Sequence, residues 1–276
     1  CALPIFKNAG ASVEFITVIN DDPIGEWALE ELEKGGITAR NIKERGRITT
    51  RKSVIDCKGY KLLKLDEVDN RPIGMETLTN ITEFMDKSNS DICLFSDFRH
   101  GIFNNASIPI LSSSSKKFKF RVADSQVASR WGNIVDYKDF NLITPNEMEA
   151  RFSLGDQDST IHRLAINLMT ATRAKNIIIK LGERGLLACS GASNSPNYYG
   201  LDSLNRNVVD AVGSGDALLA YATLSLSVSD NIGLASLLGS LAASIACSRN
   251  GNIPVSIPEM KQGIKNLELL IGYSEE

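Results

Sequence analysis

A carboxylate placed directly after a glycine-rich turn is the feature of this sequence best suited to chemistry. The stretch reads Val209-Asp210-Ala211-Val212-Gly213-Ser214-Gly215-Asp216, and it lies between a short β-like run and an apolar segment of helix-forming composition. Its two glycines let the backbone turn tightly, so that several N–H groups can point at one position. That position lies at a helix start, where unpaired N–H groups and the helix dipole favour an anion. We therefore expect a phosphate-binding loop here.

Asp216 stands where that anion is expected. Such a carboxylate can accept the proton of a hydroxyl that attacks a phosphoryl group, while backbone amides stabilise the developing charge. The amides of residues 212–216 would form this anion hole. The alternative is a glycine-rich loop whose acidic residue only stabilises the first turn of a helix. The rest of the chain has to decide between the two interpretations.

The composition indicates a globular protein without an extended surface of one charge. The sequence has 276 residues, 43% of them hydrophobic, and a formal net charge of −3. This charge predicts neither nucleic-acid binding nor attraction to an anionic membrane, and no apolar run is long enough to span a bilayer. The five cysteines are widely spaced and no pair has C-x-x-C spacing, which favours a reducing, cytoplasmic location over a disulfide framework or a zinc site.

Strand and helix signals alternate along most of the chain, which predicts an α/β fold with a mainly parallel sheet covered by helices. Loops that follow the carboxyl ends of such strands are where ligands bind in open sheets. The exception is a hairpin at about residues 47–66, with strand-like runs on either side of Cys57-Lys58-Gly59. The predicted strands include residues 13–19, 91–96, 118–122, 140–143, 176–181 and 207–209, and residues 190–203 are predicted to be a loop.

Two further stretches have the composition of helix starts. Asn20-Asp21-Asp22-Pro23-Ile24-Gly25 predicts a turn that caps a helix. In Thr144-Pro145-Asn146-Glu147-Met148-Glu149, the threonine is the expected N-cap, the proline the first helical residue and the acids the first turn.

Taken in order, N-D-D-x-x-G, T-P-N-E-x-E and D-A-V-G-S-G-D resemble the motifs of the ribokinase-like (PfkB) sugar kinases, whose C-terminal signature reads D-T-x-G-A-G-D-x-F. The departures are Ala211 for the threonine, Ser214 for the alanine and Leu219 near the phenylalanine. The resemblance extends from about Val13 to the end of the chain. It implies a ribokinase-like three-layer α/β/α fold with a mainly parallel central sheet, in which the hairpin at about residues 47–66 is a small β lid.

The resemblance also implies an ATP-dependent sugar kinase with a defined set of site residues. Asp216 would be the catalytic base, within a catalytic loop that includes Gly213, Ser214 and Gly215. Asn146 and Glu149 would help to hold Mg²⁺ and its waters, and a monovalent cation is a further candidate cofactor. The nucleotide would contact Lys180, Gly182, Asn250 and Gly251, with the loop at residues 190–203 near the adenine. Arg51, Lys64 and Arg99 would contact the sugar or its phosphate.

The substrate and the partners remain open at this level. The lid run that ends in Lys64-Leu65-Asp66 is most similar to that of the heptose-7-phosphate kinases of the family, which makes heptose 7-phosphate the first candidate. Other family substrates, such as ribose, fructose, a fructose phosphate or a nucleoside, are alternatives, and so is a non-catalytic nucleotide- or sugar-binding regulator. The resemblance implies a homodimer and allows a nucleotidyltransferase fused to the kinase or paired with it.

The beginning of the chain departs from the family. Family members start with a strand that carries a sugar-binding aspartate, followed by a G-G-x-x-x-N loop. Cys1-Ala2-Leu3-Pro4-Ile5 corresponds instead to the helix after that loop. We therefore expect residues 1–276 to be a kinase domain that is incomplete at its N-terminus. The alternative is a protein that does not bind sugar in the way of the family.

Overall fold

The computed structural model describes residues 2–57, 60–126, 133–205, 208–251, 253–270 and 272. The chain divides into two compact units. The larger unit contains Cys1–Val13, Asp91–Ser96 and Phe118–Glu276, and the smaller unit contains Glu14–Ser90 and Asp97–Lys117.

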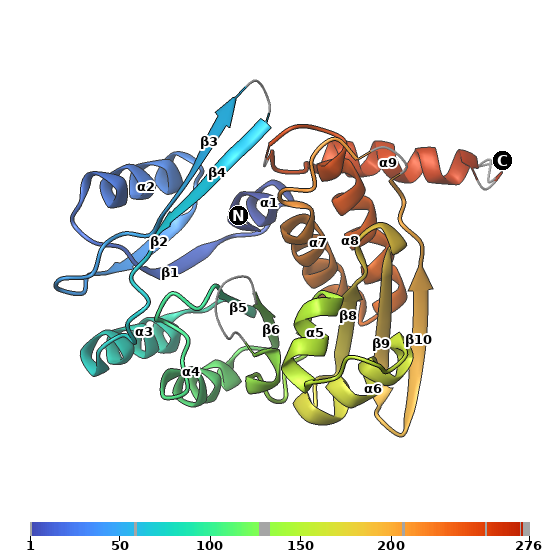
Figure 1. Ribbon diagram of the computed structural model, residues 1–276, viewed down its shortest axis with the longest axis horizontal. Helices are drawn as coiled ribbons and strands as arrows, with labels where there is room; N and C mark the ends of the chain where they lie inside the picture. Colours follow the sequence, from blue (N-terminus) through green and yellow to red (C-terminus); the bar gives the residue numbers. More distant parts are fainter. Residues whose placement is uncertain are drawn as a thin grey trace. The chain divides into compact units, whose positions relative to one another are not determined.

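The larger unit is built on a six-stranded sheet with the strand order β10-β9-β8-β7-β6-β5 (Figure 1). Strands β6, β7 and β8 run parallel, and β9 and β10 extend the sheet in antiparallel pairs. The strands are β5 (Ile92–Asp97), β6 (Phe120–Ser125), β7 (Leu142–Ile143), β8 (Asn176–Lys180), β9 (Leu186–Ala192) and β10 (Ser195–Leu201). The helices are α1 (Ala2–Asn8), α5 (Glu147–Leu154), α6 (Ile161–Thr172), α7 (Ser214–Ser229), α8 (Ile232–Cys247) and α9 (Ile257–Leu270).

Side-chain alternation along the parallel strands assigns each face of the sheet to its own helices. Val122, Leu142 and Ile178 are fully buried in one cluster with apolar residues of α7 and α8. Their sequence neighbours point to the opposite face, because successive strand residues alternate. Helices α5 and α6 contact β8. The result is a three-layer α/β/α arrangement around a mainly parallel sheet, as the sequence predicts.

The smaller unit contains a βαβ element and the predicted hairpin. Strands β1 (Glu14–Val18) and β2 (Thr38–Ile42) pair in parallel, and α2 (Pro23–Lys34) connects them. The hairpin is confirmed as β3 (Arg51–Cys57) paired antiparallel with β4 (Tyr60–Glu67), and its turn residues 58 and 59 lie outside the described chain. The unit also contains α3 (Met75–Lys87) and α4 (Ser107–Ser114).

The N-D-D-x-x-G motif caps a helix, which confirms its interpretation as turn chemistry. Asp22 is the N-cap of α2, and one carboxylate oxygen accepts from the Gly25 amide at 2.8 Å while the other accepts from the Thr49 amide at 3.0 Å. The bond from the Thr49 amide is the main reason why the pKa of Asp22 is lowered. A side chain at Gly25 would lie 2.2 Å from the carbonyl oxygen of Asn20, so only glycine fits.

Two predictions about the region before the glycine-rich loop are wrong. Residues 190–203 are mostly strand, because β9 and β10 form an antiparallel hairpin there. Its serine and asparagine residues are typical of loops, but as the edge of the sheet the segment keeps one face exposed and tolerates polar side chains. The expected strand at 207–209 is not found in its described part, since Val208 and Val209 are irregular; Asn207 lies outside the described residues.

Within the described chain, no helix is both long and apolar enough to cross a membrane.

Candidate functional site

Three parallel strands of the larger unit end at one cluster of polar side chains. Asp124 belongs to the end of β6, Thr144 directly follows β7, and Lys180 is the last residue of β8. The Thr144 hydroxyl donates to Oδ1 of Asp124 at 2.9 Å, and the ammonium of Lys180 donates to the same oxygen at 3.2 Å. Adjacent parallel strands bring their carboxyl ends to the same edge, which is where open α/β sheets bind ligands.

Lys180 connects this cluster to the glycine-rich loop. A Cβ built on Gly215 would lie 3.8 Å from Nζ of Lys180, so the ammonium is next to the first turn of α7. Burial alone would lower the pKa of Lys180. The carboxylates of Asp124, Glu149 and Asp216 outweigh that effect, and the pKa is raised. Lys180 is therefore a firmly protonated cation beside the predicted phosphate position.

The glycine-rich loop has the backbone geometry expected of an anion-binding loop. Gly213 is the N-cap of α7 with φ +83°, a left-handed conformation that favours glycine. Ser214 closes the loop by donating its hydroxyl to the Ala211 carbonyl at 2.8 Å. The Val212 amide donates to Asp210 at 3.1 Å and the Ser214 amide donates to the Ala211 carbonyl at 3.3 Å, so the amides of Gly213, Gly215 and Asp216 are the remaining candidates for the anion hole. Asp216 lies in the first turn of α7, where helix amides lack intrahelical acceptors.

The T-P-N-E-x-E motif begins α5, but not at the residue predicted. Asn146 is the N-cap and not Thr144: its side chain accepts from the Glu149 amide at 2.8 Å, and Glu149 accepts from the Asn146 amide at 2.7 Å. The shift has a physical cause. The Pro145 carbonyl accepts from the Lys180 amide at 2.9 Å, which keeps the backbone extended past β7. The side chain of Thr144 is thereby left for Asp124.

The residues present suit a magnesium ion bound largely through water and phosphate. Asn146, Glu149 and Asp124 place oxygen atoms at this edge of the sheet, the ligand type that Mg²⁺ prefers. Among the described residues, no group of three or more His, Cys, Asp or Glu could hold a metal by itself.

Two loops of the predicted nucleotide side are tied to this region. Gly182 adopts φ +64° in the turn after Lys180, and Arg184 in the same turn forms an ion pair with Glu147 at the start of α5. The Gly251 amide donates to Asp210 at 3.4 Å, which brings the loop containing Asn250 and Gly251 next to the glycine-rich loop.

The three predicted sugar contacts belong to the smaller unit, and two of them have carboxylate partners. Arg51 forms an ion pair with Glu67 across the hairpin. Arg99 contacts Asp97 with its Nε at 2.8 Å and its backbone amide at 2.7 Å, and its φ of +55° is unusual for an arginine. Lys64 is exposed on β4.

Sequence reasoning missed Asp124 and the role of the Thr144 side chain. Asp124 and Thr144 each follow apolar residues at the carboxyl end of a parallel strand. A polar residue at that position indicates a ligand site, and this was the signal that the sequence offered. Asp124 is 8% exposed and Thr144 is fully buried. A polar residue buried at such a position usually has a partner, but the sequence does not identify it.

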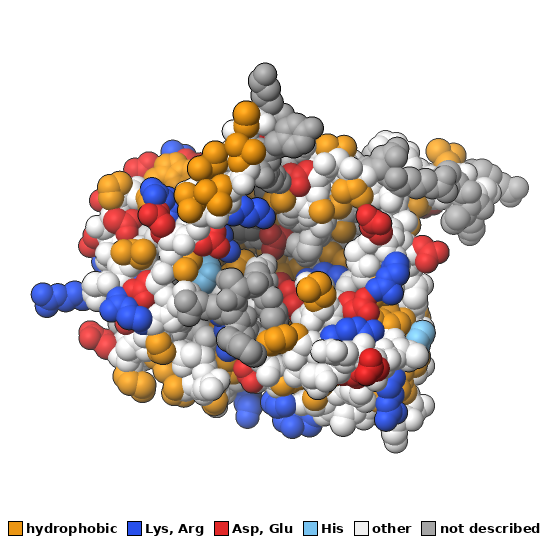
Figure 2. Space-filling view, in the orientation of Figure 1, with side chains coloured by type: hydrophobic (Ala, Val, Ile, Leu, Met, Phe, Trp, Pro, Cys, Tyr) orange, Lys and Arg blue, Asp and Glu red, His pale blue; other side chains and the backbone are white. Residues whose placement is uncertain are grey.

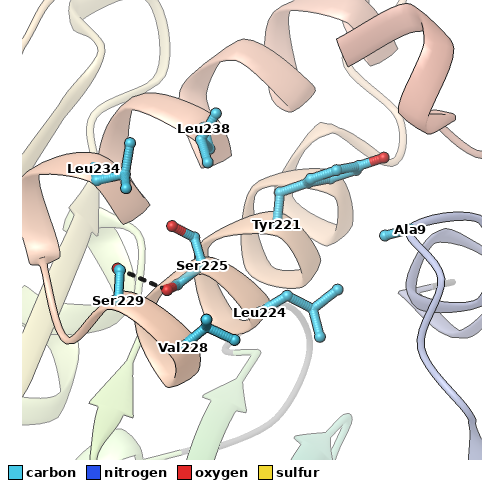
Figure 3. Close-up of a pocket in the computed structure, with 8 residues that line it drawn as sticks. All are labelled: Ala9, Tyr221, Leu224, Ser225, Val228, Ser229, Leu234 and Leu238. Atoms are coloured by element: carbon cyan, nitrogen blue, oxygen red, sulfur yellow. Dashed lines mark hydrogen bonds between the residues drawn. The ribbon is translucent and has the colours of Figure 1, made fainter. Parts of the chain in front are cut away.

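An apolar cavity of about 300 Å³ lies elsewhere in the larger unit, between α7, α8 and the segment after α1 (Figure 3). Tyr221, Leu224, Leu234 and Leu238 contribute to its lining, which contains no charged side chain. None of the predicted site residues lines this cavity, and its lining does not suit a phosphate.

We predict that Lys180→Met destabilises the protein by about 3 kcal/mol at pH 7, because it leaves the buried carboxylate of Asp124 without its cation. The folded-state pKa of Lys180 is raised above its ordinary value of 10.5. The stability that the charged ammonium of Lys180 contributes is therefore complete below pH 10.5, and it is lost as the pH rises through the folded-state pKa of this lysine. Urea unfolding between pH 7 and 11 should show a penalty that is constant at first and then shrinks.

The matched control is Lys119→Met, which removes an exposed lysine paired with Asp91 at 2.7 Å. Its effect should be much smaller, because exposed ion pairs contribute little to stability. Equal losses in the two variants would contradict a special role of the Lys180 environment in stability.

Comparison with known proteins finds relatives that are named bifunctional protein HldE. The bifunctional protein HldE of Campylobacter fetus subsp. fetus is 28% identical over 263 residues, which cover 92% of this chain and 55% of that protein. HldE of Geobacter metallireducens is 24% identical over 286 residues, which cover 96% of this chain and 56% of that protein. The chain thus spans about half the length of these curated relatives.

Solved structures agree on the fold. Phosphofructokinase-2 from Escherichia coli in complex with potassium superposes with a TM-score of 0.79 at 16% identity, over 97% of this chain and 86% of that one. Ribokinase from Thermotoga maritima gives a TM-score of 0.70 at 22% identity, over 96% of this chain and 85% of that one. Residues 4–260 match the family described as pfkB family carbohydrate kinase, and the chain therefore belongs to this family of sugar kinases.

Proposed function

We propose that this carbohydrate kinase transfers the γ-phosphoryl group of ATP to a hydroxyl of a phosphorylated sugar, with heptose 7-phosphate as the first candidate. The observation that carries the kinase chemistry is the position of Lys180 beside the glycine-rich start of α7. The choice of sugar is supported by the similarity of the lid run ending in Lys64-Leu65-Asp66 and by relatives named HldE.

The chemistry of the chain's own residues follows from this geometry. Asp216 accepts the proton of the attacking hydroxyl, and the amides at the start of α7 stabilise the negative charge on the transferred group. Lys180 neutralises phosphate charge and orients the phosphates by a point contact. Asn146 and Glu149 would hold Mg²⁺, which when bound screens the phosphates of ATP.

The acceptor would be recognised by cations of the smaller unit. Besides Arg51, Lys64 and Arg99, Lys52 on β3 has its ammonium 5.1 Å from the centre of the Phe98 ring, next to Arg99 in sequence. Several cations on the hairpin and on the loop after β5 suit a sugar that already carries a phosphate. The proposal has two further parts. The kinase would be fused to a nucleotidyltransferase or paired with one, and it would use a monovalent cation as a cofactor.

The test of the proposed function is ATP turnover with Mg²⁺ against a panel of acceptors. The panel contains heptose 7-phosphate, ribose, fructose, fructose 6-phosphate and a blank without sugar. We expect heptose 7-phosphate to give the highest kcat/KM, with the phosphorylated product identified by phosphorus NMR. Preference for another sugar would overturn the substrate but keep the kinase. Binding of ATP without any turnover would favour a regulatory binding protein instead.

Asp216→Asn should abolish most of the turnover, by a factor of about 10² to 10⁴, because it removes the general base. Binding of ATP should be largely kept, since the backbone amides are unchanged. The control is Asp230→Asn at the opposite end of the same helix, which should retain activity. An Asp216→Asn variant with normal turnover would exclude Asp216 as the base.

We also propose that the chain forms a homodimer through its hairpin. Figure 2 shows hydrophobic side chains gathered over this element, and Ile55, Leu63 and Leu65 are each 49% exposed. Ile55 pairs with Leu63 in the register of the hairpin, and Leu65 lies two residues further along β4, so the three share one face. An isolated two-stranded hairpin is marginally stable, and a second copy would bury this face.

Leu63→Asp should therefore weaken self-association, measured by sedimentation velocity over a concentration series. Val228→Asp serves as the control, because Val228 is more exposed but lies on α7. A monomeric unaltered protein, or equal association of both variants, would contradict a dimer through the hairpin.

A further inference from the structure

The cluster at the strand ends contains a residue whose role is not explained by binding or by catalysis. Thr144 is fully buried, and its hydroxyl donates to Oδ1 of Asp124 at 2.9 Å. A buried hydroxyl is costly unless it forms a hydrogen bond, and valine has nearly the same shape without that cost. Thr144 does not cap α5, since Asn146 does. The hydroxyl therefore has to be explained by its bond to Asp124.

Asp124 in turn determines where the ammonium of Lys180 lies. The oxygen that accepts from Thr144 also accepts from Lys180 at 3.2 Å. The lysine side chain has four flexible methylenes and no preferred direction for its charge. Two further carboxylates, of Glu149 and Asp216, attract the same cation. A fixed Asp124 is what selects one position for Nζ among these acids.

That position is next to the phosphate-binding loop. Nζ lies 3.8 Å from the place where a Cβ of Gly215 would be. A cation that moved toward one of the other carboxylates would be lost from this place, and a phosphate would then meet a weaker positive potential. A shift of about 1 Å in a charged contact is enough to reduce binding and catalysis markedly.

We infer that Thr144 is a positioning residue of the nucleotide site: its hydroxyl fixes the carboxylate of Asp124, and this carboxylate holds the ammonium of Lys180 beside Gly215 for the phosphates of ATP. The inference rests on the proposed function to the extent that ATP is the ligand. It assigns to Thr144 an effect on phosphate binding that a residue of the apolar core would not have.

The test compares the binding of Mg²⁺-ATP and of adenosine to the full chain by calorimetry. Thr144→Val should weaken ATP binding about tenfold, the effect of one hydrogen bond to a charged group, and leave adenosine binding unchanged. Thr144→Ser keeps the hydroxyl and should restore ATP binding. Thr223→Val is the matched control, because Thr223 is fully buried and its hydroxyl has no hydrogen-bond partner within the described chain.

A second set of variants separates positioning from a loss of folding. In an Asp124→Asn background, Thr144→Val should have little further effect on ATP affinity, because the two residues act through one path. Thr144→Ala provides the same comparison where valine disturbs the fold, which thermal unfolding detects. Equal ATP affinity of Thr144→Val and the unaltered chain would overturn the inference alone. So would a parallel loss of ATP and adenosine binding. Failure of the unaltered chain to bind ATP would overturn the proposed function as well.

Discussion

The largely buried ion pair between Lys180 and Asp124 is the interaction on which the rest of the site depends. It joins the ends of β6 and β8, and the hydroxyl of Thr144 adds the end of β7 to the same oxygen atom. Placing a cation and several carboxylates at a site that is largely shielded from water is costly unless each has a partner. The parallel sheet meets this requirement, because its strands end side by side.

The two helices that contribute to the site, α5 and α7, both begin near the ammonium of Lys180. The start of α7 brings backbone amides next to Lys180, and the start of α5 places Glu149 near the same cation. The reciprocal bonds between Asn146 and Glu149 fix the first turn of α5. The residues that begin this helix are also the candidates for holding a metal, so the helix start and the candidate metal site are formed by the same side chains.

Local chemistry could be read from the sequence, and long-range pairing could not. The cap formed by Asp22, the left-handed Gly213 and the hairpin of residues 51–67 depend on neighbouring residues, and each was predictable. The partner of Thr144 is Asp124, twenty residues earlier, and only the pairing of β6 with β7 brings the two together. The N-cap of α5 was misplaced for the same reason, since the bond between Pro145 and Lys180 comes from β8.

The carboxylate of Asp210 has a consequence for kinetics. It accepts from the amides of Val212 and Gly251, and thereby joins the glycine-rich loop to the loop after α8. If the second loop contacts the base of the nucleotide, neither end of the nucleotide can be released without disturbing the other. The residence time of the spent nucleotide would then be set by the opening of two loops together, and the rate of that opening would limit how fast the enzyme can begin its next cycle.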